Sequence, residues 1–252
     1  MSFTSGADQY DRFMGRYSAP LAPVFIDFAR LADGGRVLDV GCGPGALARE
    51  LVSRSDPALI CAVDPSEAFV AAARDRLPGV RVERAVVESL PFEDRSFDAS
   101  LAQLVVHFMV DPVAGLREMG RVTKPNGVVA ACVWDYAGGQ GPLGVFWEAA
   151  RVLDADVDDE SSRAGTRRGH LAKLFDIAGL REIEHGAISA EVEHASFEEW
   201  WEPFTLGVGP AGAHVATLSA RQRDRLRDLC RDRLPDGSFV IRAQAWAARG
   251  LV

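Results

Sequence analysis

Cysteine is scarce in this 252-residue chain, and its four cysteines are widely scattered: Cys42, Cys61, Cys132 and Cys230. None of them belongs to a CxxC motif or to a cluster with histidine, the spacings typical of redox-active and zinc-binding sites. The pattern therefore argues against a disulfide framework, and we expect no metal site.

Long apolar runs are also absent. No stretch approaches the roughly 18 apolar residues of a membrane span. The first residues, MSFTSGADQYDRF, contain neither the basic segment nor the apolar segment of a secretory signal. We therefore expect a cytoplasmic protein that does not bind a membrane.

An excess of positive charge is the third absence. The formal net charge is −8, whereas a nucleic-acid-binding surface needs a basic face or stripe. Two arginine-rich segments, residues 163–168 and 221–227, are flanked by acidic residues, and we interpret them as solvated surfaces. No nucleic-acid partner is expected, and both a monomer and a homodimer are compatible with the composition.

Short apolar runs alternate with helical patterns through the first half of the chain. The runs are rich in β-branched residues and predict buried strands at residues 36–40, 59–64, 80–85, 97–104 and 128–135. Helices are predicted between them at residues 66–77 and from Asp111-Pro112, a typical helix start, to Val122. This alternation predicts an α/β fold with a doubly wound, mostly parallel sheet and helices on both faces.

The second half is less regular. Its predicted helices cover residues 171–178, 197–204 and 219–234, and its predicted strands cover residues 180–189 and 239–248. Glycine-rich and polar stretches separate them, and we expect this half to vary in structure.

The strongest local signal is VLDVGCGPGALA at residues 37–48, where a predicted strand runs into glycines and then into a helix. Glycine lets a ligand approach the main chain closely, and a helix start offers free N–H groups. A nucleotide-like ligand therefore belongs at this turn, at the carboxyl ends of the strands.

Asp39 and Pro44 favour a cationic ligand over a dinucleotide. Gly41, Gly43 and Ala46 satisfy the dinucleotide pattern GxGxxA, which alone is a weak signal. Pro44, however, has no N–H to offer a pyrophosphate, and the Asp39 carboxylate would repel one. Asp39 suits a cationic ligand such as S-adenosylmethionine, which has an ammonium, a sulfonium and no phosphate. Two alternatives stay open: Asp39 only caps the turn, or the chain is an NAD-type oxidoreductase.

Asp64 lies 23 positions after Gly41, at the end of the second predicted strand. A carboxylate at this separation is typical of a group that binds the ribose hydroxyls of a nucleotide. The alternative is that Asp64 caps the helix that begins near Ser66, and the two roles are compatible.

With these residues, the chain resembles the class I S-adenosylmethionine-dependent methyltransferases, especially the branch of the ubiquinone and menaquinone pathways. The resemblance covers roughly residues 10–135. Its motifs, in order, are residues 37–45, 62–66, 88–98 and 116–127. It implies a Rossmann-like sheet of seven strands with the last antiparallel. It also implies a helical lid over residues 1–35, a methyltransferase domain over residues 36–252, and substrate-cap segments at about 137–170 and 191–235.

The resemblance further implies the cofactor S-adenosyl-L-methionine and the residues that contact it. These are Gly41, Cys42 and Gly43 for the methionine part, Asp64 for the ribose, Pro65, Phe69, Val87 and Glu88 for the adenine, and Gln103 for the methionine arm. The sequence departs from the family at Val86, where an acidic residue usually contacts the adenine amino group. Either Glu88 replaces that contact or the contact is lost.

The segment at residues 10–17 resembles the family's lid helix. The resemblance implies that Tyr10 covers the cofactor and that Arg16 reaches its carboxylate, a contact that suits a guanidinium. The alternative is an amphipathic helix that packs Phe13 and Tyr17 on the domain.

Methyl transfer from a sulfonium is an in-line displacement, so the protein must align the reactants and exclude water. A general base is needed only when the acceptor loses a proton, and His107 is the candidate because it follows the fourth predicted strand. The alternative is that His107 only packs or caps there. The aromatic residues of the predicted helix at 197–204 either cover a planar acceptor or seal that helix onto the core. We expect a methyltransferase for a small-molecule acceptor, with a catalytically silent cofactor-binding protein as the alternative.

Overall fold

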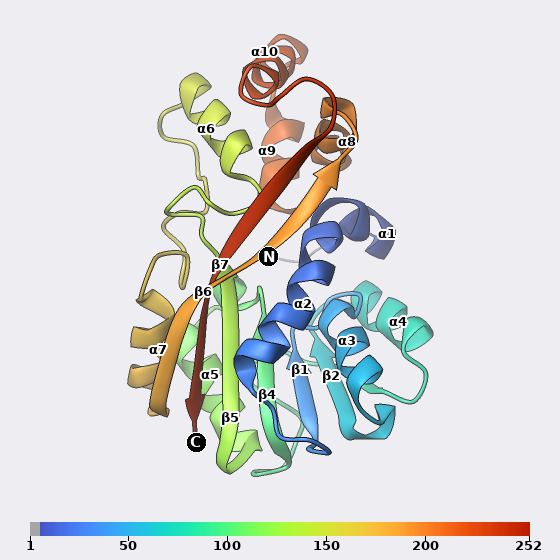
Figure 1. Cartoon of the computed structure of the whole chain (residues 1–252), viewed down its shortest axis with the longest axis vertical. Helices are drawn as coiled ribbons and strands as arrows, with labels where there is room; N and C mark the ends of the chain where they lie inside the picture. The colour runs from blue at the N-terminus through green and yellow to red at the C-terminus, as the bar shows by residue number, and fades with distance from the viewer. Residues whose placement is uncertain (1–5) are drawn as a thin grey trace.

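The computed structural model describes residues 6–252. A sheet of seven strands lies between layers of helices and carries a cap at one end (Figure 1). The strand order is β3-β2-β1-β4-β5-β7-β6. The predicted lid includes residues 1–5, which lie outside the described residues. The mostly parallel sheet confirms the predicted fold class.

The first five strands pair in parallel. They are β1 (Val37–Val40), β2 (Ile60–Asp64), β3 (Arg81–Arg84), β4 (Phe97–Gln103) and β5 (Thr123–Trp134). Every residue of β1 and β2 is buried. This explains the continuous apolar runs in the sequence, because helices cover both faces of a parallel sheet.

The last two strands are antiparallel to their neighbours. β7 (Phe239–Leu251) lies between β5 and β6 (Arg181–His194) and pairs with both in the antiparallel direction. The prediction of a final antiparallel strand is therefore confirmed. Both strands are longer than predicted. The last residue of β6, His194, pairs with the first residue of β7, Phe239, beyond the ends of the other strands and next to the cap (Figure 1).

Five helices cover the two faces of the sheet. One core cluster includes residues of α2 (Arg16–Ala29), α3 (Ala46–Arg54) and α4 (Glu67–Arg76), and the other includes residues of α5 (Pro112–Val122) and α7 (His170–Ala178). Successive side chains of β1 point to opposite faces of the sheet: Val37 belongs to the first cluster and Leu38 to the second. A short helix, α1 (Ala7–Tyr10), and a π-helical turn (Asp11–Gly15) precede α2.

The cap is built from two separate stretches of the chain. The first contributes α6 (Gly144–Leu153), and the second contributes α8 (Phe197–Trp201), a 3-10 turn (Glu202–Leu206), α9 (Gly209–Thr217) and α10 (Ala220–Arg231). α6 and α9 were not expected from the sequence.

The aromatic residues of α8 and its 3-10 turn form the core of the cap. Phe197, Trp200, Trp201 and Phe204 are all buried. Phe204 stacks on Phe146 of α6 at 4.5 Å between ring centroids and meets Phe13 edge-on at 5.0 Å. These rings therefore pack the cap against the lid. They agree with the interpretation that the aromatic residues seal this helix onto the core.

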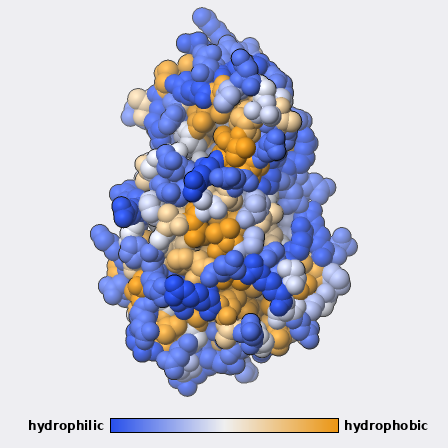
Figure 2. Space-filling model, viewed as in Figure 1, coloured by the Kyte–Doolittle hydropathy of each residue, from blue (hydrophilic) through white to orange (hydrophobic). Residues whose placement is uncertain are grey.

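The surface is mixed in character. On the face seen in Figure 2, hydrophilic residues separate the hydrophobic areas from one another. Within residues 6–252, no helix is both long and apolar enough to cross a membrane.

Candidate functional site

The glycine turn connects β1 to α3 at the carboxyl edge of the sheet. Gly41 and Gly43 have φ of +70° and +53°, a region that favours glycine. A Cβ atom on Gly41 would lie 2.5 Å from Val105, whereas a Cβ atom on Gly43 would meet nothing within 4 Å. Gly41 therefore makes a tight packing contact, and Gly43 leaves its main chain open to a ligand.

Asp39 lies under this turn and is 1% exposed. Its Oδ2 accepts no hydrogen bond. Burial raises the pKa of Asp39 to about 8, and Asp64 adds to the rise, while the backbone N–H of Ala48 partly opposes it. A buried, unpaired carboxylate is costly unless a cation or a hydrogen-bond donor meets it.

A pocket opens at the turn. It is lined by Tyr10, Ser18, Asp39, Gly41, Cys42, Gly43, Pro44, Ala46, Leu47 and Gln103. Gln103 donates its Nε2 hydrogen to the Ser18 carbonyl at 3.0 Å, while its Oε1 stays unpaired. The pocket thus holds two unpaired acceptors, Asp39 Oδ2 and Gln103 Oε1, which fit the ammonium of an amino-acid-bearing ligand.

Asp64 ties the glycine turn to the start of α4. Its Oδ2 accepts from the Gly43 N–H at 2.9 Å and its Oδ1 accepts from the Ser66 N–H at 2.8 Å. Ser66, not Asp64, is the N-cap of α4, since its hydroxyl accepts from the Phe69 N–H. Burial raises the pKa of Asp64. Each carboxylate oxygen has a second lone pair, so ribose hydroxyls can still be accepted.

Tyr10, at the end of α1, lines the pocket. The Tyr10 ring meets Phe69 of α4 edge-on, with 5.3 Å between centroids. Burial and the nearby Asp64 raise the pKa of Tyr10. Arg76 of α4 holds the lid through Asp11 at 2.6 Å and Asp8 at 3.1 Å.

Arg16 is turned toward the cap. Its guanidinium forms an ion pair with Glu199 of α8, while the neighbouring Phe13 and Tyr17 are buried, at 3% and 2% exposed. The Tyr17 hydroxyl shares a hydrogen bond with His194 at 2.8 Å. Arg16 therefore joins the lid to the cap, and its contact with a cofactor carboxylate stays a prediction.

The loop after β3 carries the residues predicted near adenine. Val87 is buried, and the Glu88 carboxylate accepts from the N–H groups of Val110 and Asp111 at 2.9 and 3.4 Å. Glu88 thus anchors the chain before α5. Val86 is 50% exposed, and Pro65 accepts a hydrogen bond from Arg84 through its carbonyl.

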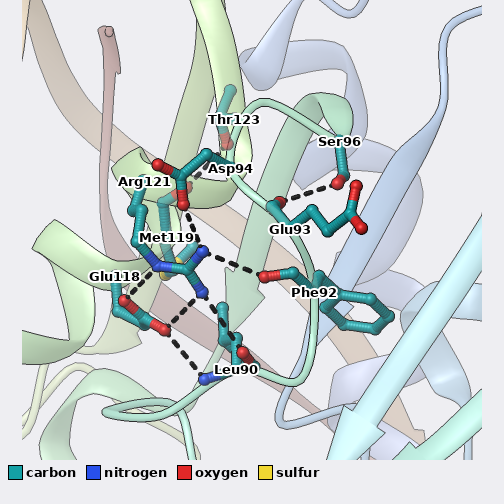
Figure 3. A network of polar contacts seen from close by, with 9 residues as sticks. All are labelled: Leu90, Phe92, Glu93, Asp94, Ser96, Glu118, Met119, Arg121 and Thr123. Atoms are coloured by element: carbon teal, nitrogen blue, oxygen red, sulfur yellow. Dashed lines mark hydrogen bonds and ion pairs between the residues drawn. The ribbon is translucent and has the colours of Figure 1, made fainter.

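The same loop is fastened to α5 by an ion-pair network (Figure 3). Arg121 contacts Glu118 at 2.7 Å and Asp94 at 2.6 Å, and it donates to the carbonyls of Leu90 and Phe92. Glu118 also accepts from the Leu90 N–H at 2.9 Å. Two sequence motifs that are far apart in the chain are therefore one structural unit.

Comparison with known proteins relates the chain that carries this site to a protein family. The family model for a methyltransferase domain matches residues 38–131, from β1 into β5. The ubiquinone/menaquinone biosynthesis C-methyltransferase UbiE of Geobacter sulfurreducens is 40% identical over 105 residues, which are 39% of this chain and 41% of that protein. These matches support a class I S-adenosylmethionine-dependent methyltransferase family for this chain.

Other members extend the likeness beyond the shared domain. A malonyl-acyl-carrier protein O-methyltransferase of Halorhodospira halophila is 38% identical over 206 residues, 78% of this chain and 63% of that protein. The chain thus spans 41% and 63% of the lengths of these two relatives. A Haemonchus contortus phosphoethanolamine N-methyltransferase, solved with S-adenosylhomocysteine, shares the fold at a TM-score of 0.61 and 17% identity, covering 98% of this chain and 57% of that one.

His107 lies in a 3-10 turn (Val106–Phe108) after β4 and is buried. Its ring lies 3.9 Å from Phe108 and 5.8 Å from Tyr136, between centroids, and its Nδ1 is unpaired. Burial and the charge of Arg163 lower the pKa of His107 to about 3. The imidazole is therefore neutral near pH 7, free to accept a hydrogen bond but a weak base.

Sequence reasoning missed two groups at the site. Ser18 lines the pocket from α2, and only its place on the inner face of the lid helix could have indicated it. Arg163 lies near His107 and pairs with Glu160, yet both come from an acidic and then basic stretch that is typical of solvated surface.

Proposed function

We propose that this chain is an S-adenosylmethionine-dependent methyltransferase that transfers a methyl group to a small-molecule acceptor by in-line displacement. The observation that carries the proposal is the pair of unpaired acceptors, Asp39 Oδ2 and Gln103 Oε1, in the pocket at the glycine turn. We further propose that the partner is neither a nucleic acid nor a membrane, and that the protein acts in the cytoplasm.

The residues at the turn would hold the cofactor in three parts. The main chain of Gly41, Cys42 and Gly43, with Asp39 and Gln103, would bind the amino-acid end. Asp64 would accept the ribose hydroxyls, and Pro65, Phe69, Val87 and Glu88 would surround the adenine. When bound, the cofactor supplies an activated methyl group on a sulfonium.

The lid and the cap would shield the reaction from water. Tyr10 lines the pocket, and the buried rings of the cap pack against the lid through Phe13. Exclusion of water and alignment of the acceptor are the main tasks left to the protein, since the leaving group needs no activation. His107 would accept a hydrogen bond from an acceptor that carries a proton.

Calorimetry with S-adenosylhomocysteine, S-adenosylmethionine and NAD tests the cofactor. We expect micromolar binding of the first two and no measurable binding of NAD, because Pro44 and Asp39 disfavour a pyrophosphate. Tight binding of NAD alone would reverse the proposal. Incubation of the protein with a labelled methyl donor and a cell extract then tests catalysis: label in a low-molecular-weight product supports it, and tight binding without any labelled product indicates a silent cofactor-binding protein.

A further inference from the structure

Glu160, in the segment between α6 and α7, combines two unfavourable features. It is 1% exposed, and neither of its carboxylate oxygens has a hydrogen-bond partner in good geometry, although Trp147, whose Nε1 is also unpaired, lies beside it. Its backbone is also in the left-handed region, at φ +66°, which is unfavourable for a residue with a side chain. Strained residues and unpaired buried polar groups are concentrated at functional sites.

Among the described residues, Glu160 has one cationic neighbour, Arg163, and two anionic ones, Asp158 and Asp159. Arg163 Nη1 lies 3.3 Å from its Oε1, and the Arg163 guanidinium lies over the Phe108 ring at 5.6 Å. Arg163 is itself largely buried, with 13% of its side chain exposed. The pair balances charge, but it leaves the hydrogen-bonding capacity of the carboxylate open.

The segment that carries Glu160 is fixed at the carboxyl edge of the sheet. Thr166 accepts a hydrogen bond from the Ala137 N–H through its carbonyl at 3.2 Å, and its hydroxyl donates to the Arg163 carbonyl at 2.8 Å. Ala137 follows β5 in the chain. Glu160 is therefore held beside the strand ends rather than on a loose surface loop.

Electrostatic coupling connects this segment with the glycine-turn pocket. Burial raises the pKa of Tyr136, and both Glu160 and Tyr10 add to the rise. Glu160 and the pocket residue Tyr10 therefore both lie close enough to Tyr136 to affect its ionisation. His107, with its unpaired Nδ1, meets the Tyr136 ring.

The unpaired groups define the chemistry of a ligand. A carboxylate and a neutral imidazole both have lone pairs to offer, and the rings of Phe108, His107 and Tyr136 suit a flat apolar partner. We propose that Glu160 recognises the methyl acceptor by accepting a hydrogen bond from an O–H or N–H group on an aromatic ring, with Arg163 holding the carboxylate in place. This inference rests on the proposed function, since it names the substrate class for the same site.

Phenol and anisole test this inference, because they differ only in the donor hydrogen and its methyl replacement. Their binding to the protein saturated with S-adenosylhomocysteine is measured by ligand-observed NMR. We expect phenol to bind at least about tenfold more tightly than anisole, since a buried acceptor rejects a ligand that cannot donate. Equal binding of the two, or no binding of phenol, overturns the inference, and this comparison needs no variant.

Glu160→Gln identifies the residue responsible. The variant is expected to lose about tenfold in phenol affinity with unchanged affinity for S-adenosylhomocysteine. Glu148→Gln, an exposed glutamate on α6, is the matched control and should behave as the parent protein. Unchanged phenol binding in Glu160→Gln contradicts the role of Glu160. If S-adenosylhomocysteine fails to bind the parent protein, the proposed function fails instead, so the two failures are distinct.

Discussion

At the scale of single residues, the Asp39 carboxylate makes the stability of the protein depend on pH. Folding raises its pKa from 3.8 to about 8, so the folded state holds the proton more tightly than the unfolded chain does. The stabilisation is complete below the unfolded pKa and is lost as pH rises toward the folded pKa.

Asp39→Asn should remove this dependence. We expect the variant to melt several degrees above the parent protein near pH 8, at about 2–4 °C per kcal/mol for a chain of this size, with the difference shrinking toward pH 4. Thermal melts across this range measure it. A difference in Tm that stays constant with pH would show that burial of the charged form is not its cause.

Gly41→Ala and Gly43→Ala form a matched pair of substitutions at two glycines of the same turn. Both have positive φ, so alanine at either position costs roughly 1–2 kcal/mol in backbone strain, but only Gly41→Ala places its Cβ against Val105. We expect Gly41→Ala to lower Tm clearly more than Gly43→Ala. Gly43→Ala should stay folded and weaken the binding of S-adenosylhomocysteine. Equal losses of stability, or unchanged binding in Gly43→Ala, would contradict the site as described.

The sequence indicated many of these residues because their roles depend on local backbone geometry. Asp39, Gly41 and Gly43 belong to one strand-turn-helix unit, and all three line the pocket. Arg16 and Glu160 differ, since their partners lie far along the chain or in a long irregular segment. No local pattern shows that Arg16 pairs with a residue of α8 or that Glu160 is buried.

At the scale of elements, the Arg121 network makes the loop after β3 depend on α5. Arg121→Ala leaves Glu118 and the carbonyls of Leu90 and Phe92 without their partner. Hydrogen bonds to charged groups contribute about 1.5–3 kcal/mol each, and partial exposure reduces that sum, so we expect a loss of about 2–3 kcal/mol. Faster hydrogen exchange in residues 86–96 and weaker binding of S-adenosylhomocysteine should accompany it.

Arg117→Ala is the control for this prediction. Arg117 lies on the same helix and, within residues 6–252, donates a side-chain hydrogen bond only to the Ile177 carbonyl, at 3.0 Å. It should leave exchange in residues 86–96 unchanged. The same acceleration in both variants would mean that the helix, and not the network, holds the loop.

α5 was predicted from a clear start signal, whereas α6 and α9 were missed. α5 begins at Asp111, whose side chain accepts from two N–H groups, and Pro112 follows it. α6 and α9 have no side-chain N-cap. In α9 a Cβ on Gly212 would lie 2.7 Å from the Gly207 backbone, so close packing rather than local propensity fixes this segment.

At the scale of the whole molecule, the parallel part of the sheet and the cap differ in how far their contacts reach along the chain. The parallel sheet results from repeated strand-helix units of neighbouring residues, so its parallel pairing could be predicted. The cap joins two stretches separated by α7 and β6, and its core forms only when Phe146 meets Phe204. Contacts over such distances leave no periodic pattern in the sequence.

The central claim is that the pocket at the glycine turn takes a cationic nucleoside through Asp39. Calorimetry with S-adenosylhomocysteine and with methylthioadenosine, which lacks the ammonium-bearing end, tests it most directly in the parent protein and in Asp39→Asn. We predict that the parent protein prefers S-adenosylhomocysteine by about tenfold or more, as expected for a charged hydrogen-bonding group, and that Asp39→Asn loses most of this preference. An unchanged preference in Asp39→Asn, or none in the parent protein, would contradict the account.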